Sequence, residues 1–105
     1  MLADGQSKLY TALKDVVGDL VGVHYQPPQN LQLKYPCVIY EMDGLQNQFA
    51  DNLPYAQMVR YSVTVMDKAP DSVLWTALLH KFQYVTLENV MNVDGIYHWN
   101  FTLYY

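Results

Sequence analysis

The sequence predicts an α+β fold: a mainly antiparallel sheet of about four strands, with two helices packed on one of its faces. Three patterns support this prediction. Apolar residues recur at helical spacing in two segments, and they alternate with a period of two in others. An Asp94-Gly95 pair separates the last two alternating segments, which is typical of a tight hairpin. The 105 residues have the length of one domain, which we expect to span residues 1–105.

The first helix is expected from Asp4 to Leu20, because apolar residues fall on a single stripe at intervals of three and four. The stripe consists of Leu9, Leu13, Val16, Val17 and Leu20. Asp4 or Ser7 can cap the start of this helix. Gly18 or Gly22 can end it, because glycine tolerates the backbone conformation that terminates a helix.

The second helix is expected to follow residues 67–72, where Pro70 and two aspartates suit a helix start. It should end near His80 and Lys81, because basic side chains favour a helix C-terminus. Its buried stripe is expected to contain Val73, Leu74, Ala77, Leu78 and Phe82, flanked by Trp75 and Leu79. Between the first helix and the first strand, residues 22–35 contain two adjacent prolines and are expected to form an extended connector.

Four strands are expected, at residues 37–42, 55–66, 84–93 and 96–105. Along them, apolar and polar residues alternate as in a sheet with one buried face. The last strand places five large residues on one face, namely Tyr97, Trp99, Phe101, Leu103 and Tyr105. A helix or a neighbouring chain must cover that face, because an apolar surface of this size is unfavourable in water.

The sequence contains no group of residues with the spacing of an active site or a metal centre. His24, His80 and His98 are isolated from one another, so no zinc-binding spacing occurs. Cys37 begins a strand and is expected to be a small buried hydrophobe. The five glycines form no phosphate-binding loop. We therefore expect no enzymatic activity, no catalytic or metal-binding residues and no cofactor.

The composition favours a subunit of a larger assembly. Charged residues make up 15% of the chain, below the roughly 25% of typical soluble domains. Ten tyrosines are present, and tyrosine is enriched at protein interfaces. The net charge of -4 argues against nucleic-acid binding driven by phosphate contacts. A single cysteine excludes an intrachain disulfide, and no apolar run approaches the roughly 20 residues of a membrane span.

Residues 44–54 are expected to be a long loop between the first two strands, since eleven residues exceed what a tight hairpin needs. Leu45, Phe49 and Leu53 lie in it, and Tyr55 follows. Two interpretations are open: the loop folds back over the edge of the core, or it is an arm that docks on a neighbouring subunit with Phe49 and Leu53 as anchors. The candidate interface residues are Leu45, Phe49, Leu53, Tyr55, Trp99, Tyr104 and Tyr105.

Four segments carry a resemblance to a known family. They are KYPCVIYEM, MVRYSVTVMD, APDSVLWTALLHKF and the closing DGIYHWNFTLYY. Their order and spacing, over residues 6–105, resemble the small tail terminator or tail completion proteins of long-tailed bacteriophages, including the minor tail proteins found in prophages.

The resemblance implies a structural protein of the virion that is not an enzyme. Such proteins form rings, commonly hexamers, that cap the head-proximal end of the tail tube after it reaches full length. The implied partners are copies of the same chain, the tail tube protein and the head connector protein. DNA passes through the ring without specific binding, and a negatively charged subunit would repel it weakly. Assembly would take place in the cytoplasm of the bacterial host.

Two other readings remain open from the residues. A head-tail connector or joining subunit would have a domain of similar size and would differ in its partner. A small ferredoxin-like domain that binds a ligand or regulates another protein would need a pocket with a few convergent polar groups. A small enzyme has the least support, because no nucleophile, metal or acid-base set is found.

Replacing Phe49 and Leu53 together with serine is expected to abolish ring formation, because the substitutions remove the apolar anchors of the arm. Light scattering on the purified chain, alone and mixed with tail tubes, measures this. Unchanged oligomers in the double variant would contradict the arm interpretation.

Overall fold

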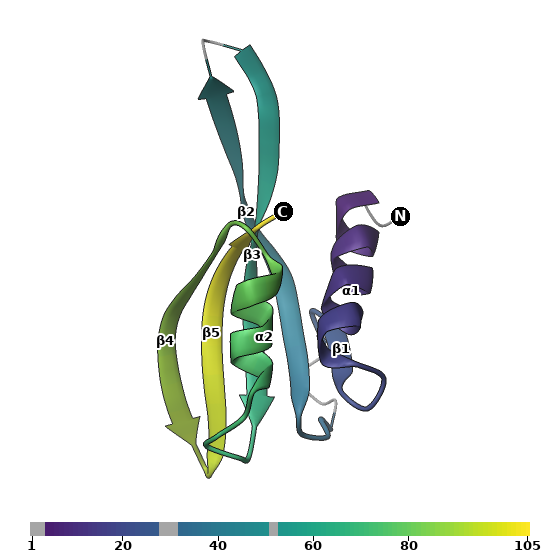
Figure 1. The fold of residues 1–105 in the computed structure, drawn as a ribbon, viewed down its shortest axis with the longest axis vertical. Coiled ribbons are helices and arrows are strands. Elements are labelled where there is room, and N and C mark those ends of the chain that lie inside the picture. The colour runs from purple at the N-terminus through teal and green to yellow at the C-terminus, as the bar shows by residue number, and fades with distance from the viewer. Residues whose placement is uncertain (1–3, 28–31, 51–52) are drawn as a thin grey trace.

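The computed structural model describes the backbone of residues 4–27, 32–50 and 53–105, and side chains over the same ranges except 4–7, 45–50 and 53–58. In these ranges the chain forms two helices and five strands (Figure 1). In chain order they are α1 (Asp4–Val17), β1 (Gly22–Tyr25), β2 (Cys37–Ala50), β3 (Leu53–Asp67), α2 (Leu74–Lys81), β4 (Val85–Val93) and β5 (Ile96–Tyr104).

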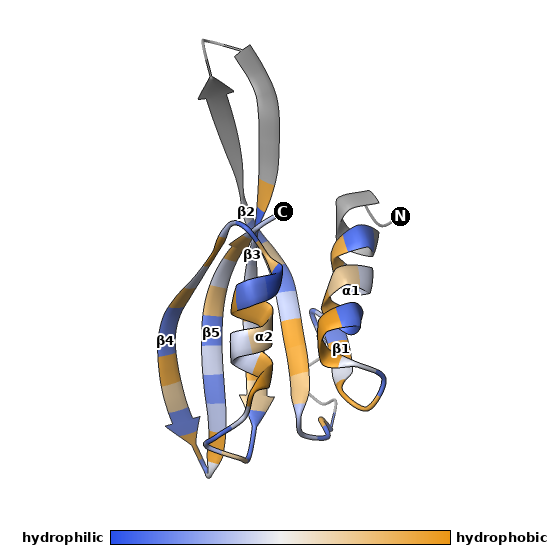
Figure 2. Cartoon of the chain, in the orientation of Figure 1, coloured by the Kyte–Doolittle hydropathy of each residue, from blue (hydrophilic) through white to orange (hydrophobic). Residues whose placement is uncertain are grey.

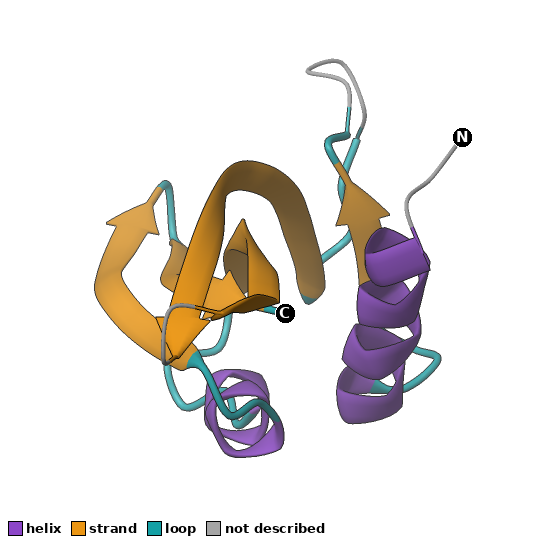
Figure 3. Cartoon of the chain, turned by 90° about the horizontal axis from the view of Figure 1, so that it is seen from above, coloured by secondary structure: helices purple, strands orange, loops and turns teal. Residues whose placement is uncertain are grey.

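The strands form one mixed sheet in the order β1-β2-β3-β5-β4. β1 runs parallel to β2, and all other neighbours are antiparallel. Both helices lie on the same side of the curved sheet (Figure 3). The predicted α+β class and the mainly antiparallel pairing are therefore confirmed, and the sheet has one strand more than expected.

The additional strand is β1, which lies in the segment expected to be a connector. Its four residues, Gly22–Tyr25, pair in register with residues 37–40 of β2. Val23 is buried in the core. Prediction failed here because a parallel partner lies far along the chain, and four residues are too few to show an alternating pattern.

α1 ends at Val17, three residues earlier than predicted. Gly18 has a φ of 84°, and its N–H donates to the Lys14 carbonyl at 2.8 Å, which confirms that Gly18 ends the helix. Leu9, Leu13 and Val17 are buried as expected, but Leu20 is 98% exposed. Leu20 lies beyond the helix and is therefore not part of its apolar stripe.

The segment expected to be an eleven-residue loop continues both flanking strands. Leu45 pairs with Val59, and the ladder extends through Gln48 and Ala56 to Ala50 and Leu53. The loop prediction is therefore wrong: residues 44–50 and 53–58 form a two-stranded hairpin. The amide-rich sequence hid this, because it lacks the apolar alternation by which strands are usually recognised.

α2 is shorter than predicted, and the face that it buries differs from the predicted apolar stripe. Leu78 is buried, whereas Val73 is 73% exposed and Ala77 is also exposed. Trp75, expected to flank the stripe, stacks on Trp99 of β5 with ring centres 6.5 Å apart. The predicted end at His80-Lys81 is confirmed.

The β4–β5 hairpin forms as predicted. Asp94 and Gly95 have φ values of 53° and 83°, the left-handed conformations that a two-residue hairpin turn requires. Hydrophobic and hydrophilic residues are interspersed along both strands (Figure 2). Trp99, Phe101 and Leu103 face the helices and are buried, so the subunit's own helices cover most of the apolar face of β5.

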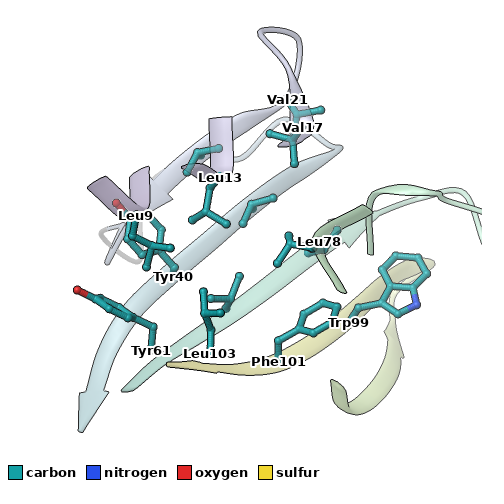
Figure 4. Close-up of a cluster of buried hydrophobic side chains, with 14 residues drawn as sticks. Leu9, Leu13, Val17, Val21, Tyr40, Tyr61, Leu78, Trp99, Phe101 and Leu103 are labelled. Atoms are coloured by element: carbon teal, nitrogen blue, oxygen red, sulfur yellow. The ribbon is translucent and has the colours of Figure 1, made fainter. Parts of the chain in front are cut away.

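One core joins the helices to the sheet (Figure 4). It contains Leu9, Leu13, Val17, Val21, Val23, Val38, Tyr40, Tyr61, Val63, Val65, Leu78, Trp99, Phe101 and Leu103. The Lys14 Nζ donates to the Val21 carbonyl at 3.0 Å, which ties the end of α1 to the turn that leads into β1.

Leu13→Ala is expected to lower the free energy of unfolding by about 2–5 kcal/mol, because Leu13 is fully buried and its removal leaves a cavity. Leu20→Ala is the matched control and should change stability by less than about 0.5 kcal/mol. Urea denaturation of both variants measures the difference. Similar losses in the two variants would contradict the assignment of the core.

Candidate functional site

The feature most distinctive of this fold is the β2–β3 hairpin that projects beyond the sheet (Figure 1). We define the arm as residues 44–50 of β2 and 53–58 of β3. Among the described strands, β1 pairs with β2 only at residues 37–40, and β5 pairs with β3 only at residues 60–67. Among the described strands, arm residues therefore pair only within the β2–β3 ribbon, where Gly44 and Leu45 stand opposite Arg60 and Val59. The arm gives the molecule a longest dimension of 47 Å, against 29 and 23 Å.

The arm leaves the sheet at a β-bulge that an ion pair stabilises. Register shifts between Met42 and Gly44, so Asp43 is the extra residue. Arg60 Nε donates to Asp43 Oδ1 at 2.9 Å, and Arg60 Nη2 donates to the Asp43 carbonyl at 3.2 Å. Hydrogen bonds to Asp43, its negative charge and a hydrogen bond to Tyr104 raise the pKa of Arg60. One guanidinium thus connects the bulge of β2, strand β3 and the end of β5.

Gly44 leaves the space that this guanidinium occupies. A Cβ atom at residue 44 would lie 2.7 Å from Arg60 Nη2, so a side chain there would push the guanidinium aside. Glycine at position 44 therefore leaves room for the Arg60–Asp43 contact where the arm begins.

An open groove of about 810 Å³ lies between α1, the α2–β4 connection and the C-terminus. We call it the aromatic groove, because Phe82, Tyr84, Tyr104 and Tyr105 line it. Phe82 meets Tyr105 edge to face, with ring centres 5.9 Å apart. Lys8, Asp15 and Lys81 also line the groove and are all exposed.

The predicted interface residues lie in three different places: the aromatic groove, the core and the arm. Tyr104 is half-buried and Tyr105 is exposed, and both line the aromatic groove. Trp99 is 4% exposed and packs between Trp75 and Tyr97 in the core of its own subunit, not on the surface. The remaining candidates are Leu45, Phe49, Leu53 and Tyr55, whose backbones lie in the arm and whose side chains lie outside the described set.

The sheet face opposite the helices carries a chain of polar contacts that sequence reasoning missed. Thr64 Oγ1 donates to Asn100 Oδ1 at 2.8 Å, and Asn100 Nδ2 donates to Asn89 Oδ1 at 2.7 Å. These side chains connect β3, β5 and β4 across one face. The polar residues of the alternating pattern were a signal for this face, but their partners depend on strand order, which the sequence did not show.

The edge formed by β4 is also exposed. Val90, Met91 and Val93 are 50%, 46% and 47% exposed. They are apolar residues of a strand that ends the strand order, and because side chains alternate along a strand, Val90 lies on one face of the sheet and Met91 and Val93 on the other.

Burial changes the acidity of side chains in the core. Cys37 is buried as predicted, and burial raises the pKa of its thiol to about 11, so it remains protonated at neutral pH. Burial, with neighbouring tyrosines, raises the pKa of Tyr40 to about 12. Within the described ranges, no three histidine, cysteine or acidic side chains are placed to hold a metal ion. None of the helices described there is long and apolar enough to cross a membrane.

Comparisons with known proteins leave the family of this chain open. No protein-family model matches the chain, and no curated protein matches its sequence. We therefore base the proposed function on the arm, the aromatic groove and the β4 edge.

The burial of Cys37 predicts a pH dependence of stability. Its pKa rises from 9.0 to about 11 on folding, so the folded state holds the proton more tightly than the unfolded state. This stability is complete below pH 9 and is lost as pH rises towards 11. We expect the free energy of unfolding to fall by about 1 kcal/mol between about pH 8 and pH 10.

Urea denaturation at several pH values measures this effect. Cys37→Ala is the control, because it removes the thiol and should make the pH dependence shallower by the part that Cys37 contributes, even if it lowers overall stability. Equal pH dependence in the two proteins would contradict the assignment.

Proposed function

We propose that this chain is a structural protein of a bacteriophage or prophage virion, which caps the tail tube as a ring. In this proposal the ring ends polymerisation of the tube and offers a surface for joining the head. The observation that carries the proposal is the arm, a hairpin whose strands pair with each other beyond the sheet. A two-stranded ribbon is marginally stable by itself in water, so a partner that covers it is physically favoured.

The distribution of surfaces supports the ring. A ring needs two different, complementary surfaces on each subunit, so that one contact repeats around an axis. The arm projects from one part of this subunit, and the aromatic groove and the β4 edge lie on its body. Low charge and many tyrosines also suit extensive contacts between subunits. A head-tail connector would use the same surfaces and differ in its partner.

The aromatic groove is the feature that favours the alternative of a ligand-binding domain. Its volume of about 810 Å³ lies within the range of ligand pockets. However, Lys8, Asp15 and Lys81 are exposed, whereas a ligand pocket places convergent polar groups within an apolar cavity. The groove therefore suits contact with another protein surface better than capture of a small molecule.

Polymerisation of the tail tube protein of the same phage tests the proposal. Added during polymerisation, the chain is expected to bind one end of each tube and to stop growth there, as electron microscopy of tube ends and lengths would show. Tubes that keep their length distribution and carry no additional density at either end would contradict the proposal.

A further inference from the structure

The free edge of β4 is a surface that the fold of the described chain leaves incomplete. β4 ends the strand order β1-β2-β3-β5-β4, so one of its sides meets no described strand. The opposite edge strand, β1, has four residues, whereas β4 has nine. A long open edge presents unpaired N–H and C=O groups, which favour the addition of a strand from another chain.

The hairpin register shows which backbone groups point outwards. The Tyr104 N–H donates to the Tyr84 carbonyl at 2.9 Å. Hydrogen-bonded and non-hydrogen-bonded pairs alternate along antiparallel strands. Val85 and Leu87, which stand opposite Leu103 and Phe101, therefore direct their N–H and C=O groups away from β5. These groups are available to a further strand.

β4 carries only part of the protection that sheet edges usually have. It contains no lysine and no proline, and Glu88 is its one charged residue. A bulge between Leu87 and Asn89 is its sole irregularity. Val90, Met91 and Val93 are about half exposed, so a strand laid alongside would bury apolar surface as well as form backbone hydrogen bonds.

The arm provides a complementary edge. On its β3 side, Pro54 lacks an N–H group, and Val59 already exchanges backbone hydrogen bonds with Tyr105. On its β2 side, residues 44–50 contain no proline and no charged residue. Among the described strands, nothing pairs with the outer edge of these seven residues.

We propose that the free edge of β4 pairs with the outer edge of residues 44–50 in a second copy of this chain. Residues 44–50 carry no charged side chain and β4 carries one, Glu88, so the two segments meet without the repulsion that like charges on neighbouring strands would cause. The choice of the arm over a second β4 edge rests on the proposed ring. Two β4 edges related by a twofold axis would close at a dimer, whereas a β4–arm contact joins different surfaces and repeats around an axis.

Site-specific cross-linking of the full chain tests the contact. One copy carries Asn92→Cys in β4, and a second copy with a mass tag carries Asn47→Cys in the arm. A short bis-maleimide is expected to join the two copies at least ten times faster than it joins Asp19→Cys to Asn47→Cys. Asp19 is exposed in the turn after α1 and is the control. The unmodified chain controls for Cys37, which is buried.

A matched pair of substitutions tests the edge itself. Val90→Lys, introduced beside Asn92→Cys, is expected to slow this cross-link at least tenfold, because a lysine opposes strand addition. Val90→Thr keeps the β-branched shape without the charge and should leave the rate unchanged. Cross-linking no faster than the Asp19 control, equal rates in both Val90 variants, or preferential joining of two Asn92→Cys copies would overturn the proposal.

Tube capping by the same variants separates this proposal from the proposed function. If the chain caps tubes but the β4–arm cross-link is no faster than the control, the contact is wrong and the function stands. If the cross-link forms as expected but the chain does not cap tubes, the function is wrong and the contact stands.

Discussion

The long antiparallel pairing between β2 and β3 is the interaction on which the rest of the structure depends. Residues 60–66 of β3 lie between β2 and β5, so the central strand of the sheet continues into the arm. Because an isolated two-stranded ribbon is marginally stable, the arm depends on the body for its alignment. The Arg60–Asp43 contact lies at the bulge, where the body of the sheet ends and the arm begins.

The two faces of this sheet differ in what covers them. Its helix face is closed by α1 and α2, and Leu9, Leu13 and Leu78 meet residues of β2, β3 and β5 in one core. The opposite face is polar, with Thr64, Asn100 and Asn89 joined by hydrogen bonds. Among the surfaces that these contacts leave open are the arm, the aromatic groove and the β4 edge. These are the surfaces on which we base the proposed assembly.

Sequence patterns predicted the parts of the fold that local interactions determine. The Asp94-Gly95 hairpin and the buried positions Leu9, Leu13 and Val17 were recognised because their signals lie within a few residues. β1 and the arm residues 44–50 of β2 were missed because their pairing is not accompanied by apolar alternation, whereas residues 55–58 of β3 were included in a predicted strand. Of the candidate interface residues, Tyr104 and Tyr105 line a groove, whereas Trp99 belongs to the core because α2 supplies Trp75 to cover it.

We propose that backbone edges left unpaired in one copy of this chain form hydrogen bonds with a second copy. Amide hydrogen exchange, followed by mass spectrometry in dilute and in assembled protein, tests it most directly, because exchange slows where N–H groups become hydrogen-bonded. We expect slower exchange on assembly in β4 and in residues 44–50, with little change in residues 60–66 of β3, which are already paired on both sides. Assembly that leaves exchange in β4 and the arm unchanged would contradict it.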